Sequence, residues 1–193
     1  MIMHPTLAQT AFPRHTLARD VALVLGGSLL IALGARLEVP LPWTPVPITL
    51  QTLFVLLVGA ALGPRLGALA ALAYLAEGAA GLPFFSGGAA GAAKLFGATG
   101  GYLLSFPVMA ALVGALVQRA AVDRRLHTAA LAMLLATFVN YLMGVTWLGV
   151  ALPGHQSVAA LLNMGAWPFI AGDALKAGLV ALLLPATWAM LKK

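Results

Sequence analysis

Long stretches without a charged residue constrain the fold of this chain more than any other feature of its sequence. A bilayer core of about 30 Å requires roughly 20 helical residues, with a range of about 17–25. Six stretches near that length carry at most two ionisable side chains each, namely residues 21–35, 39–64, 66–82, 99–118, 126–152 and 168–191. Because these are continuous apolar runs and not segments of alternating polarity, they predict helices rather than a β-barrel. We therefore expect an all-α integral membrane protein with six transmembrane helices.

Composition supports this fold class and excludes several others. Hydrophobic residues make up 62% of the 193 positions and charged residues only 8%, and the mean hydropathy is +0.99. A soluble domain has about a quarter of its residues charged. A chain this apolar cannot cover itself with a surface that faces water everywhere, which excludes a soluble domain, a disordered tail and a nucleic-acid-binding module. We expect a single transmembrane domain over residues 1–193, embedded in the lipid bilayer.

The positions of the basic residues predict how the chain is oriented in the membrane. Six spans place both termini on one side. Eight Lys and Arg residues then fall on that side and only Arg36 and Lys94 on the other; the eight are Arg14, Arg19, Arg65, Arg119, Arg124, Arg125, Lys192 and Lys193. Positive residues concentrate on the cytoplasmic side of membrane proteins. We expect cytoplasmic termini, with residues 1–16 as an N-terminal cytoplasmic segment, in the cell membrane of a bacterium.

This topology gathers the polar side chains of several spans in the outer half of the bundle. Asp173 and Lys176 lie roughly 8 and 12 Å inside the last span if it is a helix that begins at Pro168. The other polar and aromatic candidates are Gln51, Asn140, Tyr141, Tyr74, Tyr102 and Trp147, with Lys94 in an outer Gly-rich loop. Polar groups that converge at one depth are what a ligand pocket open to the outside requires.

The spacing of Asp173 and Lys176 makes them the strongest candidates. A charge within a span costs about 3 kcal/mol, and residues at i and i+3 share one face of a helix. They form either a ligand site or a structural ion pair. Gln51 and Asn140 either contact a ligand or join helices through hydrogen bonds. The aromatic side chains either line the cavity or belong to the membrane interface, and Lys94 either guards the mouth or is solvated.

Small residues at helical spacing suggest close helix packing. Ser28 and Ala32 stand four residues apart in the first span and are our candidate docking surface for a membrane partner. Gly59, Gly63 and Gly67 continue the same spacing across the turn between the second and third spans, where internal packing is the favoured interpretation.

Motifs of enzymes are absent from the sequence. There is no Gly-Lys dipeptide and hence no Walker A loop, and neither H-E-x-x-H nor G-x-S-x-G occurs. The chain has no cysteine, and its four histidines show no metal-ligand spacing. We expect no catalytic residue, no metal site, no cofactor and no enzymatic activity.

Four stretches resemble the BioY family, the biotin-specific substrate-binding (S) component of energy-coupling factor (ECF) transporters. They are PLPWTPVPITLQTLFVLLVGAALGPRLGAL at 40–69, GLPFFSGG at 81–88, GATGGYL at 97–103 and PFIAGDALKA at 168–177. The first is long and specific, and the last contains Asp173 and Lys176 in the D-x-x-K pattern of the family. The resemblance implies an ECF S-component-like bundle in which these two residues meet biotin.

The resemblance also implies a mechanism and partners. An S component captures biotin with high affinity from outside, associates with a transmembrane coupling (T) subunit and two ATPase subunits, and topples in the membrane to deliver it. Biotin is then the transported substrate and not a cofactor. An S component for another vitamin and a stand-alone biotin transporter are the alternatives.

Overall fold

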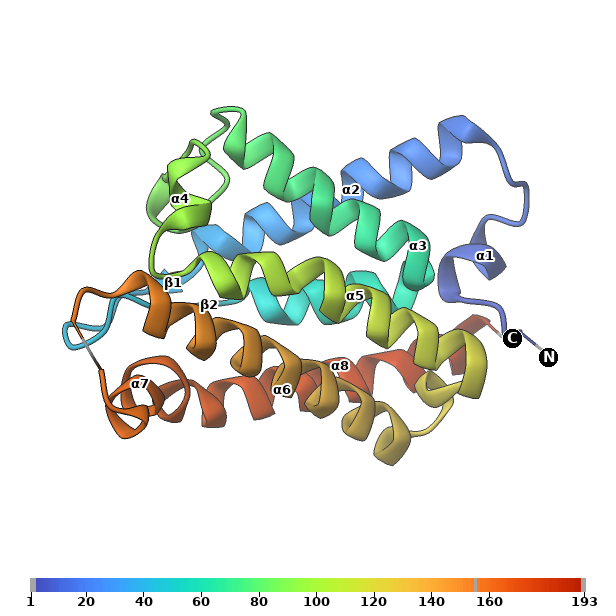
Figure 1. Ribbon diagram of the computed structural model, residues 1–193. Coiled ribbons are helices and arrows are strands. Elements are labelled where there is room, and N and C mark those ends of the chain that lie inside the picture. The colour runs from blue at the N-terminus through green and yellow to red at the C-terminus, as the bar shows by residue number, and fades with distance from the viewer. Residues whose placement is uncertain (1–2, 155, 192–193) are drawn as a thin grey trace.

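The computed structural model describes residues 3–154 and 156–191, which are almost entirely helical (Figure 1). The elements in chain order are α1 (Leu7–Ala11), α2 (Leu17–Arg36), β1 (Glu38–Val39), β2 (Ile48–Thr49), α3 (Gln51–Ala79), η1 (Ser86–Gly88), α4 (Ala93–Phe96), α5 (Gly100–Ala120), η2 (Val122–Arg124), α6 (Leu126–Ala151), α7 (Val158–Gly165), η3 (Trp167–Phe169) and α8 (Ile170–Leu191). The predicted all-α membrane fold is confirmed.

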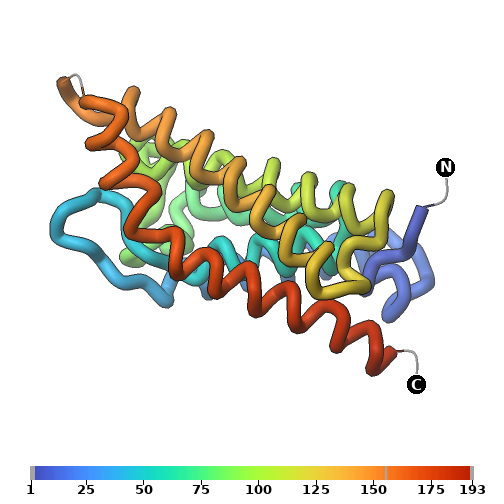
Figure 2. The backbone as a smooth tube through the Cα atoms, turned by 90° about the horizontal axis from the view of Figure 1, so that it is seen from below, coloured from blue at the N-terminus to red at the C-terminus, as the bar shows by residue number. Residues whose placement is uncertain are grey.

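The long helices run side by side between two ends of the molecule. α1 and the last turns of α8 lie at one end, whereas β1, β2, α4 and α7 lie at the other (Figures 1 and 2). We call these the inner end and the outer end, after the predicted topology. Two of the eight basic residues from which that topology was predicted, Lys192 and Lys193, lie outside the described residues.

α3 reverses direction in its middle. Gly63 has φ 85° and ψ 178°, a conformation open mainly to glycine, and Pro64 follows it. A Cβ on Gly67 would lie 2.9 Å from the Cα of Gly59, so residues 51–62 and 64–79 form two helical segments that pack on each other. Among the residues that the structure describes, five helices are long and apolar enough to cross a membrane, and this reversed helix is one of them. The count of six crossings and the cytoplasmic position of the termini stay predictions.

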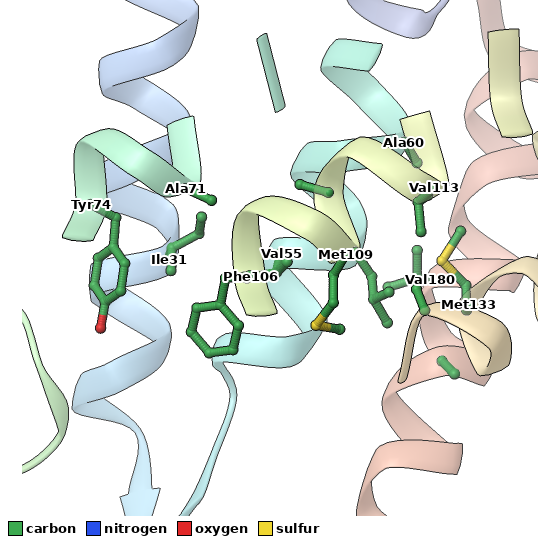
Figure 3. Close-up of a cluster of buried hydrophobic side chains, with 14 of the residues drawn as sticks. Ile31, Val55, Ala60, Ala71, Tyr74, Phe106, Met109, Val113, Met133 and Val180 are labelled. Carbon is green, nitrogen blue, oxygen red and sulfur yellow. The ribbon is translucent and has the colours of Figure 1, made fainter. Parts of the chain in front are cut away.

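The core lies between α3 and α5 and is completed by side chains of α2, α6 and α8. Figure 3 shows part of it, with Ile31, Val55, Phe106, Met109 and Val180 converging between the helices. The helices approach closely because small residues lie at the contacts: a Cβ on Gly59 would lie 2.7 Å from the Cα of Ala110. The Gly59, Gly63 and Gly67 run therefore serves internal packing, as favoured above.

The outward faces of the helices are apolar as well. Exposed large hydrophobic side chains occur along α2, α5, α6 and α8, including Leu29, Leu131, Phe138, Leu142 and Leu182. Apolar surface on this scale is unsuited to water and suits the acyl chains of a bilayer. This is a multi-pass membrane protein.

The connections at both ends carry short elements. The connection between the third and fourth predicted spans contains η1 and α4. The connection between the fifth and sixth contains α7, whose first turn is capped by Ser157 accepting from the Ala160 N–H. At the inner end, the described part of the predicted N-terminal segment contains α1, which starts with a capping box between Thr6 and Gln9.

Candidate ligand-binding site

A pocket between the outer halves of α3, α5, α6 and α8 gathers most of the predicted polar residues. Its lining residues are Val46, Pro47, Thr49, Gln51, Thr52, Ser86, Thr99, Tyr102, Leu103, Phe106, Asn140, Tyr141, Phe169, Asp173 and Lys176. The space free inside it is about 60 Å³, which suffices for a few water molecules. The polar groups are thus assembled, but the pocket is narrow.

Asp173 and Lys176 form the centre of a buried hydrogen-bond network. Lys176 Nζ lies 2.8 Å from Asp173 Oδ1, and the two residues are 8% and 5% exposed. Thr52 donates to the same carboxylate oxygen at 3.1 Å and accepts from Lys176 Nζ at 3.3 Å. Tyr141 donates to Asp173 Oδ2 at 2.6 Å. The predicted ion pair is therefore present, and three helices hold it.

The sequence explains why these groups meet at one depth. Asp173 stands in the first turn of α8, where the positive end of the helix dipole favours a carboxylate. Lys176 follows one turn later on the same face. Thr52 stands in the first turn of α3, which also begins at the outer end. Two helix starts therefore bring their polar residues to one level of the bundle.

Two side-chain amides complete the polar lining. Asn140 on α6 accepts from the Ser105 hydroxyl at 2.7 Å through Oδ1, which leaves its amide nitrogen as a donor beside the pocket. Gln51 donates through Nε2 to the Tyr74 hydroxyl at 2.6 Å. Both amides join helices, and both also line the pocket. Hydrogen bonding between helical segments is therefore present for both, and contact with a ligand stays a prediction.

Aromatic and aliphatic side chains form the remaining walls. Tyr102, Phe106 and Phe169 line the pocket, and the Tyr102 hydroxyl donates outward to the carbonyl of Gly165 at 2.7 Å. This hydrogen bond fixes the ring of Tyr102 and uses the proton of its hydroxyl, so the ring presents an apolar face to the pocket. Such walls suit an apolar ring system on a ligand.

Three of the predicted residues lie elsewhere. Tyr74 is fully buried behind the pocket, in an edge-on contact with Phe85 at 5.6 Å between ring centres, and reaches the site only through Gln51. Trp147 lies outside the lining and donates to the carbonyl of Gly97 at 3.0 Å. Lys94 and Glu38 line a second hollow beside the pocket. Pro47 and Ser86 line both the hollow and the pocket.

Sequence reasoning missed several lining residues, above all Thr52. A threonine in a membrane helix can satisfy its hydroxyl on its own backbone, so its presence alone signals little. The signal that could have found Thr52 is its place beside Gln51 in the same helical turn. Phe169 could have been found in a similar way, because it directly follows Pro168 at the start of the last span.

The predicted docking residues Ser28 and Ala32 do not form a surface. Ser28 is fully buried and Ala32 is 6% exposed, and Ser28 donates a hydrogen bond to Glu77 on α3. Their face of α2 packs against α3 inside the protein. The prediction was wrong in its choice of face, because the exposed small residues of α2 are Ala18, Ala22 and Gly26.

Comparisons with known proteins agree with this architecture. The model of the BioY family matches residues 5–193. The chain is 38% identical to the biotin transporter BioY of Rhodobacter capsulatus, over 84% of this chain and 91% of that protein. It is 35% identical to the biotin transporter BioY of Rhizobium etli, over 86% of this chain and 90% of that protein.

A solved structure has the same fold. The crystal structure of the S-component for biotin from an ECF-type ABC transporter superposes with a TM-score of 0.81 at 25% sequence identity. The superposition covers 91% of this chain and 95% of that one, so the likeness extends over the whole bundle.

Proposed function

Because this chain belongs to the BioY family, we propose that it binds biotin with high affinity at the outer pocket and takes it up as the membrane-embedded S component of an ECF-type transporter. The family is one of transporters and not of enzymes, so ATP hydrolysis falls to partner subunits. The observation that carries the proposal is the buried Asp173–Lys176 pair in a pocket that opens toward the outer end.

The chemistry of biotin matches the groups around this pair. Its ureido ring has two N–H donors and a carbonyl acceptor, its bicycle is apolar, and its side chain ends in a carboxylate. Asp173 accepts hydrogen bonds, whereas Lys176 and the amide nitrogen of Asn140 donate them. The faces of Tyr102, Phe106 and Phe169 suit the bicycle.

Charge balance favours one orientation of the ligand. The charges of Asp173 and Lys176 cancel each other, so a carboxylate brought beside them would be a second buried anion sharing one cation, which is costly. The ureido group is neutral and supplies both donors and an acceptor. We therefore place the ureido ring at the Asp173–Lys176 pair and the carboxylate toward the mouth, on the side of Lys94.

Entry of biotin requires the outer connections to move. The pocket has about 60 Å³ of free space, which is too little for a bicyclic ring. Val46 and Pro47 precede β2, and Ser86 lies in η1, so their segments form part of the wall without belonging to the long helices. Outward movement of these segments opens the pocket with the helix bundle unchanged.

The proposed partners are a T subunit and two ATPase subunits, with toppling of the loaded protein as the delivery step. Support for these partners comes from the likeness to an S-component of an ECF-type transporter. For the docking surface we now propose the exposed face of α2 with Ala18, Ala22 and Gly26, where small residues at helical spacing let another helix approach.

Calorimetric titration of the purified protein with biotin tests the proposal. Wild type is expected to bind one biotin, and Asp173→Asn to bind it more than about tenfold more weakly, because a charged hydrogen-bond acceptor is worth roughly 1.5–3 kcal/mol. Glu77→Gln is the matched control, since it makes the same change at a carboxylate outside the pocket.

Two results would contradict the proposal. Unchanged affinity of Asp173→Asn removes this residue from the site. Absence of biotin binding by folded wild type removes biotin as the ligand, and titration with other vitamins then tests the alternative S-component role. Uptake by this chain alone, in cells without T and ATPase subunits, would favour a stand-alone transporter.

A further inference from the structure

A second polar pocket lies at the inner end, opposite the site of the proposed function. Its volume is about 240 Å³, and its lining includes Gln9 on α1, Arg19 on α2, Arg65 on α3 and Gln118 on α5. Four elements thus contribute a side chain that can donate hydrogen bonds. Nothing in the capture of a ligand at the outer end uses this pocket.

Arg19 is the more buried of the two arginines that line the pocket. Its side chain is 10% exposed, and its guanidinium contacts Asp20 Oδ1 at 2.9 Å, His15 Nδ1 at 3.1 Å and the carbonyl of Ala8 at 3.0 Å. Its Nε is buried and has no hydrogen-bond partner among the residues that the structure describes. These contacts hold the guanidinium at the wall of the pocket, where it supplies the first cation.

Arg65 supplies the second cation. It stands directly after the reversal of α3 at Gly63 and Pro64, is exposed, and forms no ion pair within residues 3–154 and 156–191. Because Asp20 offsets only one of the two guanidinium groups, the lining carries a net charge of +1 (two Arg, one Asp, His15 neutral). The pocket therefore favours an anion.

An apolar groove continues from the same place along the helices. It has a volume of about 480 Å³ and is lined by side chains of α2 and of the second segment of α3, among them Val24, Leu69 and Ala73. Asp20, Arg65 and Leu66 line both the groove and the polar pocket. Figure 1 shows these two helical segments crossing each other and separating toward the inner end.

We propose that the inner end binds an anionic phospholipid, with its phosphate at Arg19 and Arg65 and an acyl chain in the groove between α2 and α3. A basic pocket that opens into an apolar groove matches the two parts of one lipid molecule. Basic pockets between membrane helices on the cytoplasmic side bind anionic head groups. A soluble phosphate would use the polar pocket alone and would leave the groove without a role.

Native mass spectrometry of the full chain in detergent tests this proposal. The probes are dioleoylphosphatidylglycerol and dioleoylphosphatidylcholine, which share acyl chains and differ in charge. Wild type is expected to retain the anionic lipid about fivefold better, the contribution of one basic residue near the surface. Arg65→Gln removes that preference. Arg14→Gln is the matched control, an exposed arginine at the same end that does not line the pocket.

Two further arms separate a lipid from a soluble anion. Ala73→Phe fills the groove and is expected to lower retention of the anionic lipid, whereas excess glycerol 1-phosphate is expected not to displace it. Equal retention of the two lipids, or equal effects of Arg65→Gln and Arg14→Gln, would overturn the proposal. Displacement by glycerol 1-phosphate at the lipid's own concentration would overturn it too, in favour of a soluble anion. Thermal unfolding midpoints and biotin titration of each variant show that the fold and the outer site are intact.

Discussion

At the scale of single residues, Asp173 and Lys176 stand out because each neutralises the buried charge of the other. Their atoms are 2.8 Å apart in the wall of the outer pocket, and Thr52 and Tyr141 also donate to the carboxylate, which has one acceptor site left for a ligand. An ion pair of this kind is poor evidence for stability, since burying both charges costs about as much as their attraction returns. The presence of this pair fits a role in binding better than one in folding.

A set of three variants separates these roles. Asp173→Leu and Lys176→Met are each expected to destabilise the protein by about 3–5 kcal/mol, because each leaves one buried charge without a partner. The double variant is expected to return close to wild-type stability, since it removes both charges. Thermal unfolding in detergent measures stability, and biotin titration measures binding.

The double variant decides between a binding pair and a structural pair. If the pair contacts biotin, the double variant is stable and does not bind. If it only fixes helix packing, the double variant binds biotin as wild type does, and our assignment of the site is wrong.

At the scale of the elements, the reversal in α3 determines which residues reach the pocket. Gly63 and Pro64 turn the chain at the inner end. The first segment, residues 51–62, therefore begins at the outer end with Gln51 and Thr52. Residues 64–79 return to the outer end and place Tyr74 behind Gln51. One turn far from the pocket thus sets the register of one of its walls and of Tyr74, the residue behind that wall.

Gly63→Ala is expected to destabilise the protein by about 1–3 kcal/mol, because an L side chain at φ 85° and ψ 178° is strained. A Cβ there would also lie 3.0 Å from Nε2 of Gln118. Gly178→Ala in α8 is the control, since a Cβ at that position meets nothing within 4 Å. Equal unfolding midpoints for the two variants would contradict a special role for the Gly63 conformation.

The place of some residues within these helices could be predicted from the sequence, and that of others could not. Asp173 and Lys176 could, because a charge inside an apolar span is costly enough to need a reason. Ser28 and Ala32 could not, since a four-residue spacing identifies a face of a helix but not whether that face points inward or outward. The same ambiguity affects Trp147, because an aromatic side chain serves either a cavity or a helix contact.

At the scale of the whole molecule, the two ends differ in chemistry. The outer end holds a neutralised ion pair among aromatic rings, and the inner end holds Arg19, Arg65 and the connection around Asp123 and Arg124. Asp123 is fully buried there and accepts from the indole of Trp188, which joins the α5–α6 connection to α8. The predicted orientation places this basic end in the cytoplasm.

Cysteine labelling measures this orientation directly, because the chain contains no cysteine of its own. Ala92→Cys in the outer connection is expected to react with a membrane-impermeant maleimide in intact cells. Arg14→Cys, at the inner end, is expected to react only after the membrane is opened. Both positions are exposed in the structure. Labelling of Arg14→Cys in intact cells would reverse the orientation and place the biotin pocket on the cytoplasmic side.

The cancellation of charge between Asp173 and Lys176 has an electrical consequence for delivery. Since the pair contributes no net charge, a loaded site carries only the negative charge of the biotin carboxylate. Moving one negative charge toward the negative interior of a cell works against the membrane potential, by about 2.3 kcal/mol per 100 mV. The potential therefore opposes inward delivery of this ligand, and the proposed ATPase partners would supply the work.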